Sequence, residues 1–159
     1  MHQFFRNLEN VPWIANTNGD AGLISLVWLA HYLGMFLLVG ATVFVDLRLL
    51  GFAGQGYGVR KLASQLLPWS WVGVVMLLPS GFVMFAGQAT VFYPATVFHI
   101  KLIVFVLALI VGILVQSKIP QWDQMPEIPP GAKFIAAISI VLWIGAILSS
   151  LEVPAFLPI

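Results

Sequence analysis

Two histidines lie in long apolar stretches of this chain, and they are the first candidates for chemistry. His31 lies within residues 21–45, which contain no Asp, Glu, Lys or Arg, and His99 lies in a later apolar stretch. A helix in hydrocarbon rarely carries an imidazole unless a partner or a ligand uses it. Imidazole is also a common axial ligand of haem iron. The pair therefore points to a cofactor site or to two buried polar contacts.

A single b-type haem is the cofactor that this pair could hold. Counted from the expected helix ends, His31 lies ~15 Å and His99 ~8 Å from the same membrane face. In a four-helix bundle the first and third helices are diagonal, with axes roughly 11–14 Å apart, which leaves room for iron between two imidazoles. Gly34, one turn from His31, would make space for the flat macrocycle. We therefore predict His31 and His99 as axial ligands of one haem b.

Lys101 is the third candidate for cofactor binding. It lies on a different face of the third apolar helix from His99. Its side chain could snorkel to the interface, pair with Glu152, or contact a haem propionate.

Two other interpretations of the histidines stay open. Each imidazole could bond to a neighbouring helix without any cofactor, a contact worth ~0.6 kcal/mol. The second interpretation is a site for a bare metal ion. His31 and His99 alone are too few ligands for zinc, which takes three or four from the protein. Met76 and Met84 could complete a Cu(I) site, since thioethers are soft ligands. The chain has no cysteine, which excludes thiolate metal sites and cysteine-ligated iron–sulfur clusters.

The composition places the chain in a membrane. Of its 159 residues, 60% are hydrophobic and 8% are charged, whereas soluble domains carry about 25% charged residues. About 20 apolar residues suffice to cross the bilayer. We predict an all-α integral membrane protein of one domain, a four-helix up-down bundle. The expected spans are residues 21–49, 68–87, 94–117 and 132–151, and a net charge of +1 argues against a nucleic-acid partner.

Residues 1–20 are predicted to precede the bundle as a short amphipathic helix. They mix aromatic and polar residues, a pattern typical of a helix that lies in the membrane interface. Asn18 and Gly19 favour a turn. Asp20 is expected to cap the first spanning helix, where its carboxylate accepts free N–H groups.

The basic residues predict the orientation. Most fall on the side of the first and third loops: Arg48, Arg60, Lys61, Lys118 and Lys133. The positive-inside rule places this side in the cytoplasm and both termini outside. Asp46 is expected at the same interface, paired with Arg60 or Lys61.

Several motifs resemble a largely uncharacterised bacterial family of small four-helix membrane proteins. The motifs are His31-x-x-Gly34, residues 45–51 (VDLRLLG), 67–71 (LPWSW), 79–81 (PSG) and 98–101 (FHIK). The chain is also distantly similar to copper-resistance D type proteins and to four-helix b-type cytochromes. The resemblance covers residues 25–118 and implies a four-helix bundle. A cytochrome with two haems across the membrane would need four histidines, and this chain offers two within the bilayer.

These observations favour a haem b-binding electron-transfer subunit of a larger membrane complex. The first alternative is a cofactor-free structural subunit of a respiratory or photosynthetic complex. The second is a transporter of copper or a small solute. We find no nucleophile–base pair, phosphate loop or carboxylate dyad, so the expected role is non-catalytic.

Overall fold

The structure, a computed structural model, describes the backbone of residues 2–155 and the side chains of residues 2–150. Within these residues the chain is helical, with no strand. The helices are α1 (His2–Glu9), α2 (Pro12–Gly19), α3 (Ala21–Leu50), α4 (Val59–Gly87), α5 (Ala89–Phe92), α6 (Thr96–Trp122) and α7 (Pro130–Ala155).

Four of these helices are long and apolar enough to cross a membrane, namely α3, α4, α6 and α7. Their outer surfaces carry many large exposed apolar side chains, such as Phe36, Val75 and Val141, which suits contact with lipid. The prediction of an all-α, four-helix membrane protein is confirmed.

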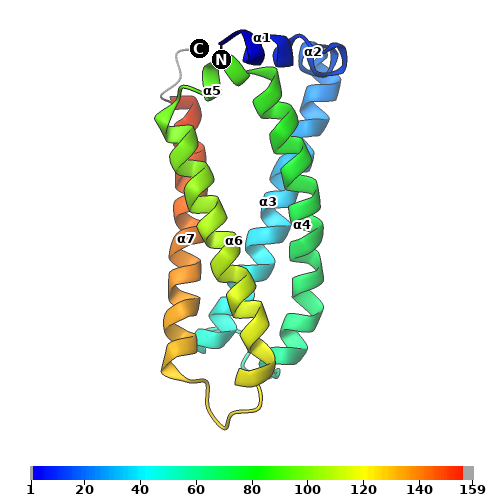
Figure 1. Cartoon of the computed structure of the whole chain (residues 1–159). Helices are drawn as coiled ribbons and strands as arrows, with labels where there is room; N and C mark the ends of the chain where they lie inside the picture. The colour runs from blue at the N-terminus through cyan, green and yellow to red at the C-terminus, as the bar shows by residue number, and fades with distance from the viewer. Residues whose placement is uncertain (1, 156–159) are drawn as a thin grey trace.

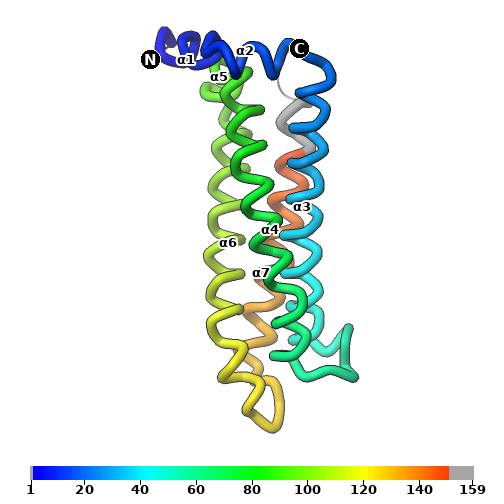
Figure 2. The backbone as a smooth tube through the Cα atoms, turned by 90° about the vertical axis from the view of Figure 1, so that its right-hand side faces the viewer, coloured from blue at the N-terminus to red at the C-terminus, as the bar shows by residue number. Residues whose placement is uncertain are grey.

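The four spans form two closely packed pairs, α3 with α4 and α6 with α7 (Figure 1). Helix α3 also packs on α7, so α3 and α6 are diagonal. Helices α1, α2 and α5 and the last turns of α7 lie at one end of the bundle, which we call the terminal end (Figure 2). The loops α3–α4 and α6–α7 lie at the opposite end, the loop end. Helices α4 and α6 approach each other at the loop end and diverge towards the terminal end.

At the loop end, a hydrophobic cluster joins all four spans. We call it the loop-end core: Val45, Leu49, Val59, Ala63, Val115, Ile119, Trp122, Ala132 and Ala136. Small alanine and valine side chains let the helix axes approach closely. A second cluster in the middle of the bundle is built on Leu38, Ala108, Trp143 and Ala146.

Helix α4 begins at Val59, so the prediction that it starts at Pro68 is wrong. The first turns bury Val59 and Ala63 in the loop-end core, and this burial stabilises helical structure before the proline. Pro68 therefore lies inside the helix, as does Pro79. Helix α6 likewise continues past its predicted end, because Ile119 and Trp122 join the same core.

Helices α3 and α4 touch backbone to backbone at Gly34 and Gly73. A Cβ on Gly73 would lie 2.6 Å from the Gly34 carbonyl oxygen, and a Cβ on Gly34 would lie 2.9 Å from that of Gly73. Only glycine at both positions permits this approach, a device common where membrane helices cross. The crossing fixes the position of His31, one turn before Gly34, relative to α4.

The N-terminal helices lie across the terminal end and are attached there by specific contacts (Figure 1). Glu9 Oε1 accepts hydrogen bonds from the Thr90 backbone N and Oγ1, both at 2.7 Å. The Phe5 ring lies 4.2 Å from that of Tyr93. Asp20 caps α3 as predicted, since its Oδ1 accepts from Gly22 N at 2.8 Å and Leu23 N at 2.9 Å.

Candidate cofactor cavity

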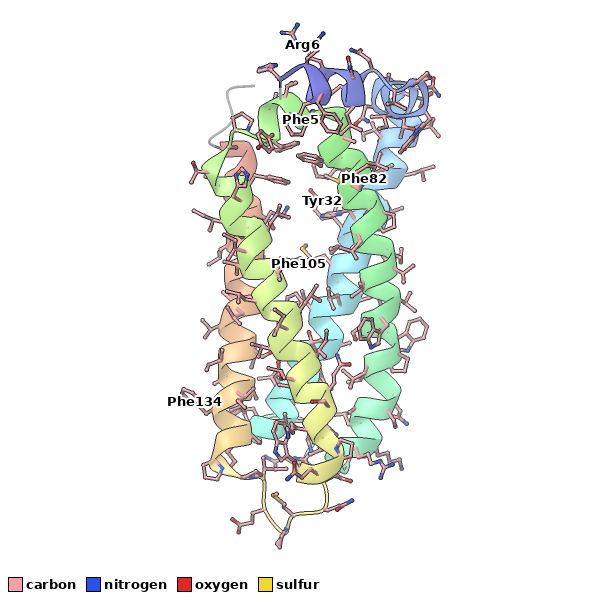
Figure 3. All side chains as sticks on the ribbon, in the orientation of Figure 1. Phe5, Arg6, Tyr32, Phe82, Phe105 and Phe134 are labelled. Atoms are coloured by element: carbon pink, nitrogen blue, oxygen red, sulfur yellow. The ribbon has the colours of Figure 1, made fainter. Side chains whose placement is uncertain are left out.

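A cavity of about 310 Å³ lies between the four spans in the terminal half of the bundle, and we call it the terminal cavity. Its wall is mostly apolar and includes one nitrogen-bearing side chain on each of two diagonal helices, His31 on α3 and Lys101 on α6. Aromatic rings make up much of the remainder: Phe82, Phe85, Phe98, Phe105 and Trp143. Figure 3 shows Phe105 in the space between the helix pairs and Phe134 on the outer surface of α7.

Stacked rings close the cavity towards the terminal end. The Phe85 and Phe98 rings are 5.3 Å apart and nearly parallel, at an interplanar angle of 8°, and they join α4 to α6 where these helices diverge. Phe5 of α1 packs edge-on against Phe85 at 6.4 Å. The amphipathic N-terminal segment thus forms part of the roof.

The tautomer of His31 follows from its hydrogen bonds. Its Nδ1 lies 3.1 Å from Ser80 Oγ, and the Ser80 hydroxyl already donates to the Met76 carbonyl oxygen at 2.7 Å. A hydroxyl has a single hydrogen, so when that hydrogen is donated to the Met76 carbonyl oxygen, Ser80 accepts from His31 Nδ1–H. Nε2 is then the ring nitrogen with a free lone pair. Gly81 gives the ring its room, since a Cβ there would lie 3.1 Å from His31 Cε1.

Lys101 lines the cavity from the opposite side of the bundle and is partly buried. Among the described side chains it has no ion-pair partner. The predicted pairing with Glu152 concerns a side chain outside the described residues. An ammonium group in an apolar wall attracts a carboxylate or a carbonyl oxygen of a bound molecule.

The structure does not bring His99 to His31. His99 is exposed, its Nδ1 lies 3.0 Å from the Ala95 carbonyl oxygen, and its ring packs edge-on against Tyr93 at 5.9 Å. It is not part of the wall of the terminal cavity. Gly34 is not part of that wall either, and its role is the close crossing with Gly73.

The face of α6 that lines the cavity carries Phe98, Lys101 and Phe105. Residues three and four apart share one face of a helix, and His99 falls off this stripe. The two histidines were paired on residue type and expected depth, and because the other residues of α6 are also mostly apolar, no pattern in its sequence marks this stripe as the inward face. Ser80, which orients His31, was likewise missed.

The prediction that Asp46 forms an interfacial ion pair with Arg60 or Lys61 is wrong. Asp46 is 2% exposed and lies inside the bundle, with its Oδ2 lining a small cavity beside Ser139. Arg60 instead donates its backbone N–H to Asp123 Oδ1 at 3.2 Å, and the Lys61 ammonium lies 5.8 Å from the centre of the Tyr57 ring. The turn of α3 that carries Asp46 is covered by α7, which the sequence of α3 alone does not reveal.

Comparisons with protein-family models, with curated proteins and with solved structures found no match for this chain. Its fold and its cavity are therefore the basis for the functional argument.

Proposed function

We propose that this protein is a membrane-embedded electron-transfer subunit that holds one b-type haem in the terminal cavity. The observation that carries the proposal is the environment of His31. The half-buried His31 ring has Nδ1 3.1 Å from Ser80 Oγ, and when Nδ1–H is donated to that oxygen Nε2 keeps a lone pair, in an aromatic cavity. Histidines that bind metal typically donate their other ring N–H to such a partner.

In this proposal, different residues of the cavity bind different parts of the haem. His31 Nε2 would be the protein's axial ligand, with Ser80 holding the ring in place. The five aromatic rings suit the faces and edges of a flat macrocycle, and Lys101 would pair with a propionate. His99 would take no part, so the proposed ligand set differs from the predicted pair. When bound, the haem supplies one-electron redox chemistry.

The cavity must enlarge to hold a haem. About 310 Å³ lies at the lower end of the range for small-molecule sites, roughly 300–1,000 Å³. A full macrocycle needs more space, and Phe82, which is 50% exposed, is the ring that can swing outward to provide it.

A second candidate ligand is a quinone headgroup, favoured by the cavity volume and by Lys101. A single ring fits without rearrangement. Its carbonyl oxygens would accept from the Lys101 ammonium, and a quinol hydroxyl would donate to His31 Nε2. The subunit would then bind a lipid-soluble electron carrier directly.

An absorption spectrum of the purified protein, expressed with ample haem and recorded oxidised and then reduced with dithionite, tests the first proposal. We expect the Soret and reduced α bands in the unmodified protein, their loss in His31→Ala, and their retention in the matched control His99→Ala. Absence of a Soret band from the unmodified protein would overturn the haem. Loss in both variants would instead restore the predicted histidine pair.

Organic extraction of the same preparations tests the second candidate. A quinone that co-purifies with the unmodified protein and is depleted in Lys101→Gln supports it. Equal quinone content in Lys101→Gln and in His99→Ala counts against it.

We further propose that the loop end faces the cytoplasm of a bacterial inner membrane and that other subunits bind the lipid-facing helices. The support for the orientation is the excess of basic residues at the loop end. The chain lacks cysteine, so Thr17→Cys at the terminal end and Gln124→Cys at the loop end can be labelled singly in intact cells. An impermeant maleimide should label the first and not the second.

A further inference from the structure

Three buried polar side chains between the middle of the bundle and the loop end have an atom without a hydrogen-bond partner among the described residues. The atoms are Asp46 Oδ2, Ser139 Oγ and Trp143 Nε1. Their side chains are 2%, 0% and 1% exposed. Buried polar atoms are almost always bonded to protein or to ordered water. The Asp46 and Ser139 side chains lie close enough to hydrogen-bond to each other, and bound water is the partner open to the Trp143 N–H and to the remaining lone pairs.

Two small cavities lie beside these atoms, each of about 10 Å³. A cavity of this size holds about one water molecule. Polar side chains of the upper water cavity are Thr42, Ser70, Gln116 and Trp143. Those of the lower water cavity are Thr42, Asp46, Gln116 and Ser139. Each cavity therefore has the several polar partners that a buried water requires.

The water cavities lie in series with larger spaces on both sides. The upper one shares Leu38 and Trp143 with the terminal cavity, and the two water cavities share Thr42, Gly112 and Gln116. Gln116 also lines a surface groove between α4 and α6. We call it the loop-end groove, and its residues include Arg60, Ser64, Leu67, Trp71, Gln116 and Pro120. A single side chain, Gln116, thus borders both water cavities and the groove.

No basic side chain lines the lower water cavity to balance a charge on Asp46. Arg48, on the same helix, donates its Nε to the Tyr57 carbonyl oxygen at 2.9 Å. The other basic residues of the loop end, on α4, α6 and α7, are exposed: Arg60, Lys61, Lys118 and Lys133. The Thr42 hydroxyl donates to the Leu38 carbonyl oxygen at 2.7 Å, so it offers the cavity only an acceptor. Ser139 can donate one hydrogen bond to the Asp46 carboxyl, but no cation balances a negative charge there, so the protonated carboxyl costs less to bury than the carboxylate.

We propose that Asp46 is an internal proton-carrying residue on a route of bound waters between the loop-end groove and the terminal cavity. A proton from water in the groove passes Gln116, is held on the Asp46 carboxyl, and moves on through the water beside Trp143. Each water gives up one proton as it receives one, so no other reactant is needed. The loop-end core blocks a direct route from Asp46 to the loops, which makes Gln116 the separating side chain.

Infrared spectroscopy of the purified protein in H₂O and D₂O tests the assignment without any cofactor. We expect the C=O stretch of a protonated carboxyl in the unmodified protein, displaced in D₂O and lost in Asp46→Asn. The matched control Asp123→Asn, at an exposed loop-end carboxylate, should retain it. Asp46→Glu keeps a carboxyl and should return the band at a changed position, which separates loss of the group from misfolding. A missing band in the unmodified protein, or its persistence in Asp46→Asn, would overturn the proposal.

The rate at which the band shifts after transfer to D₂O tests the route. Gln116→Leu removes the polar side chain at the junction and should slow the shift relative to the unmodified protein. Gln121→Leu, on the exposed surface of the same helix, should leave the rate unchanged. Equal rates in both variants would show that protons do not pass Gln116.

Discussion

The two halves of the bundle are built from the same four helices and are packed in opposite ways. At the loop end, alanine and valine side chains from all four spans interlock, with Ala132 and Ala136 at most 1% exposed. At the terminal end, α4 and α6 diverge and large aromatic rings surround a cavity of about 310 Å³. The loop half contains the larger buried cluster, and the terminal half contains the cavity that we propose binds a ligand.

This arrangement allows a small membrane protein to be stable and still contain a cavity. Tight packing lowers the free energy through many dispersion contacts, and a cavity forfeits some of them. Concentrating the close packing in one half leaves the other half free to bind.

Replacing one alanine by leucine in each half should show the largest difference in stability between the two halves. Ala136→Leu, in the loop-end core, should destabilise the protein by about 1–3 kcal/mol because no space exists for the added atoms. Ala146→Leu, in the wall of the terminal cavity, should cost less than half as much and reduce ligand binding instead. Chemical denaturation in detergent, followed by tryptophan fluorescence, measures both. Equal losses of stability would mean that the halves do not differ in packing.

The glycine crossing lies between the halves, and substitution there should weaken both. Gly73→Ala places a Cβ 2.6 Å from a backbone oxygen of α3, so the helices must separate, at a cost of about 1–3 kcal/mol. Gly40→Ala is the matched control, since its Cβ would meet nothing within 4 Å, and it should be neutral or stabilising by up to about 1 kcal/mol. Thermal unfolding of the two variants distinguishes a specific crossing from a general preference for glycine.

Ser80→Ala sharpens the account of the terminal half. It removes the acceptor that orients His31 and leaves the ring in the cavity, so ligand affinity should fall by about 10- to 100-fold with stability little changed. Ser70→Ala, a buried serine of the same helix far from His31, is the control. Titration of haem or quinone into the ligand-free variants measures the change. An unchanged ligand affinity in Ser80→Ala would show that Ser80 does not orient His31 for binding.

The smallest expected effect is at the N-cap of α3. Asp20→Ala should cost about 1 kcal/mol because two backbone N–H groups lose their acceptor. Asp20→Asn keeps a capping oxygen and should recover most of this. Hydrogen exchange at Gly22 and Leu23 should rise in Asp20→Ala while exchange in the loop-end core stays unchanged. A change that spread to the loop end would contradict the separation of the two halves.

The membrane class, the four spans and local features such as the Asp20 cap could be predicted from the sequence. These follow from composition, from apolar length and from residues adjacent in the chain, which act over a few ångströms. Helix ends were predicted less well where packing extends them. Pro68 signals a helix start in isolation, and the loop-end core overrides that signal by burying the turns that precede it.

Which polar groups face one another depends on how the helices pack. His31 and His99 are both histidines in apolar helices, yet the rotation of α6 puts Phe98, Lys101 and Phe105 in the cavity wall and leaves His99 outside it. Asp46 has the sequence context of an interfacial residue, and the packing of α7 beside α3 buries it next to Ser139. In an almost uniformly apolar helix no periodic pattern marks the inward face, so the rotation of each helix is set by its contacts with the others.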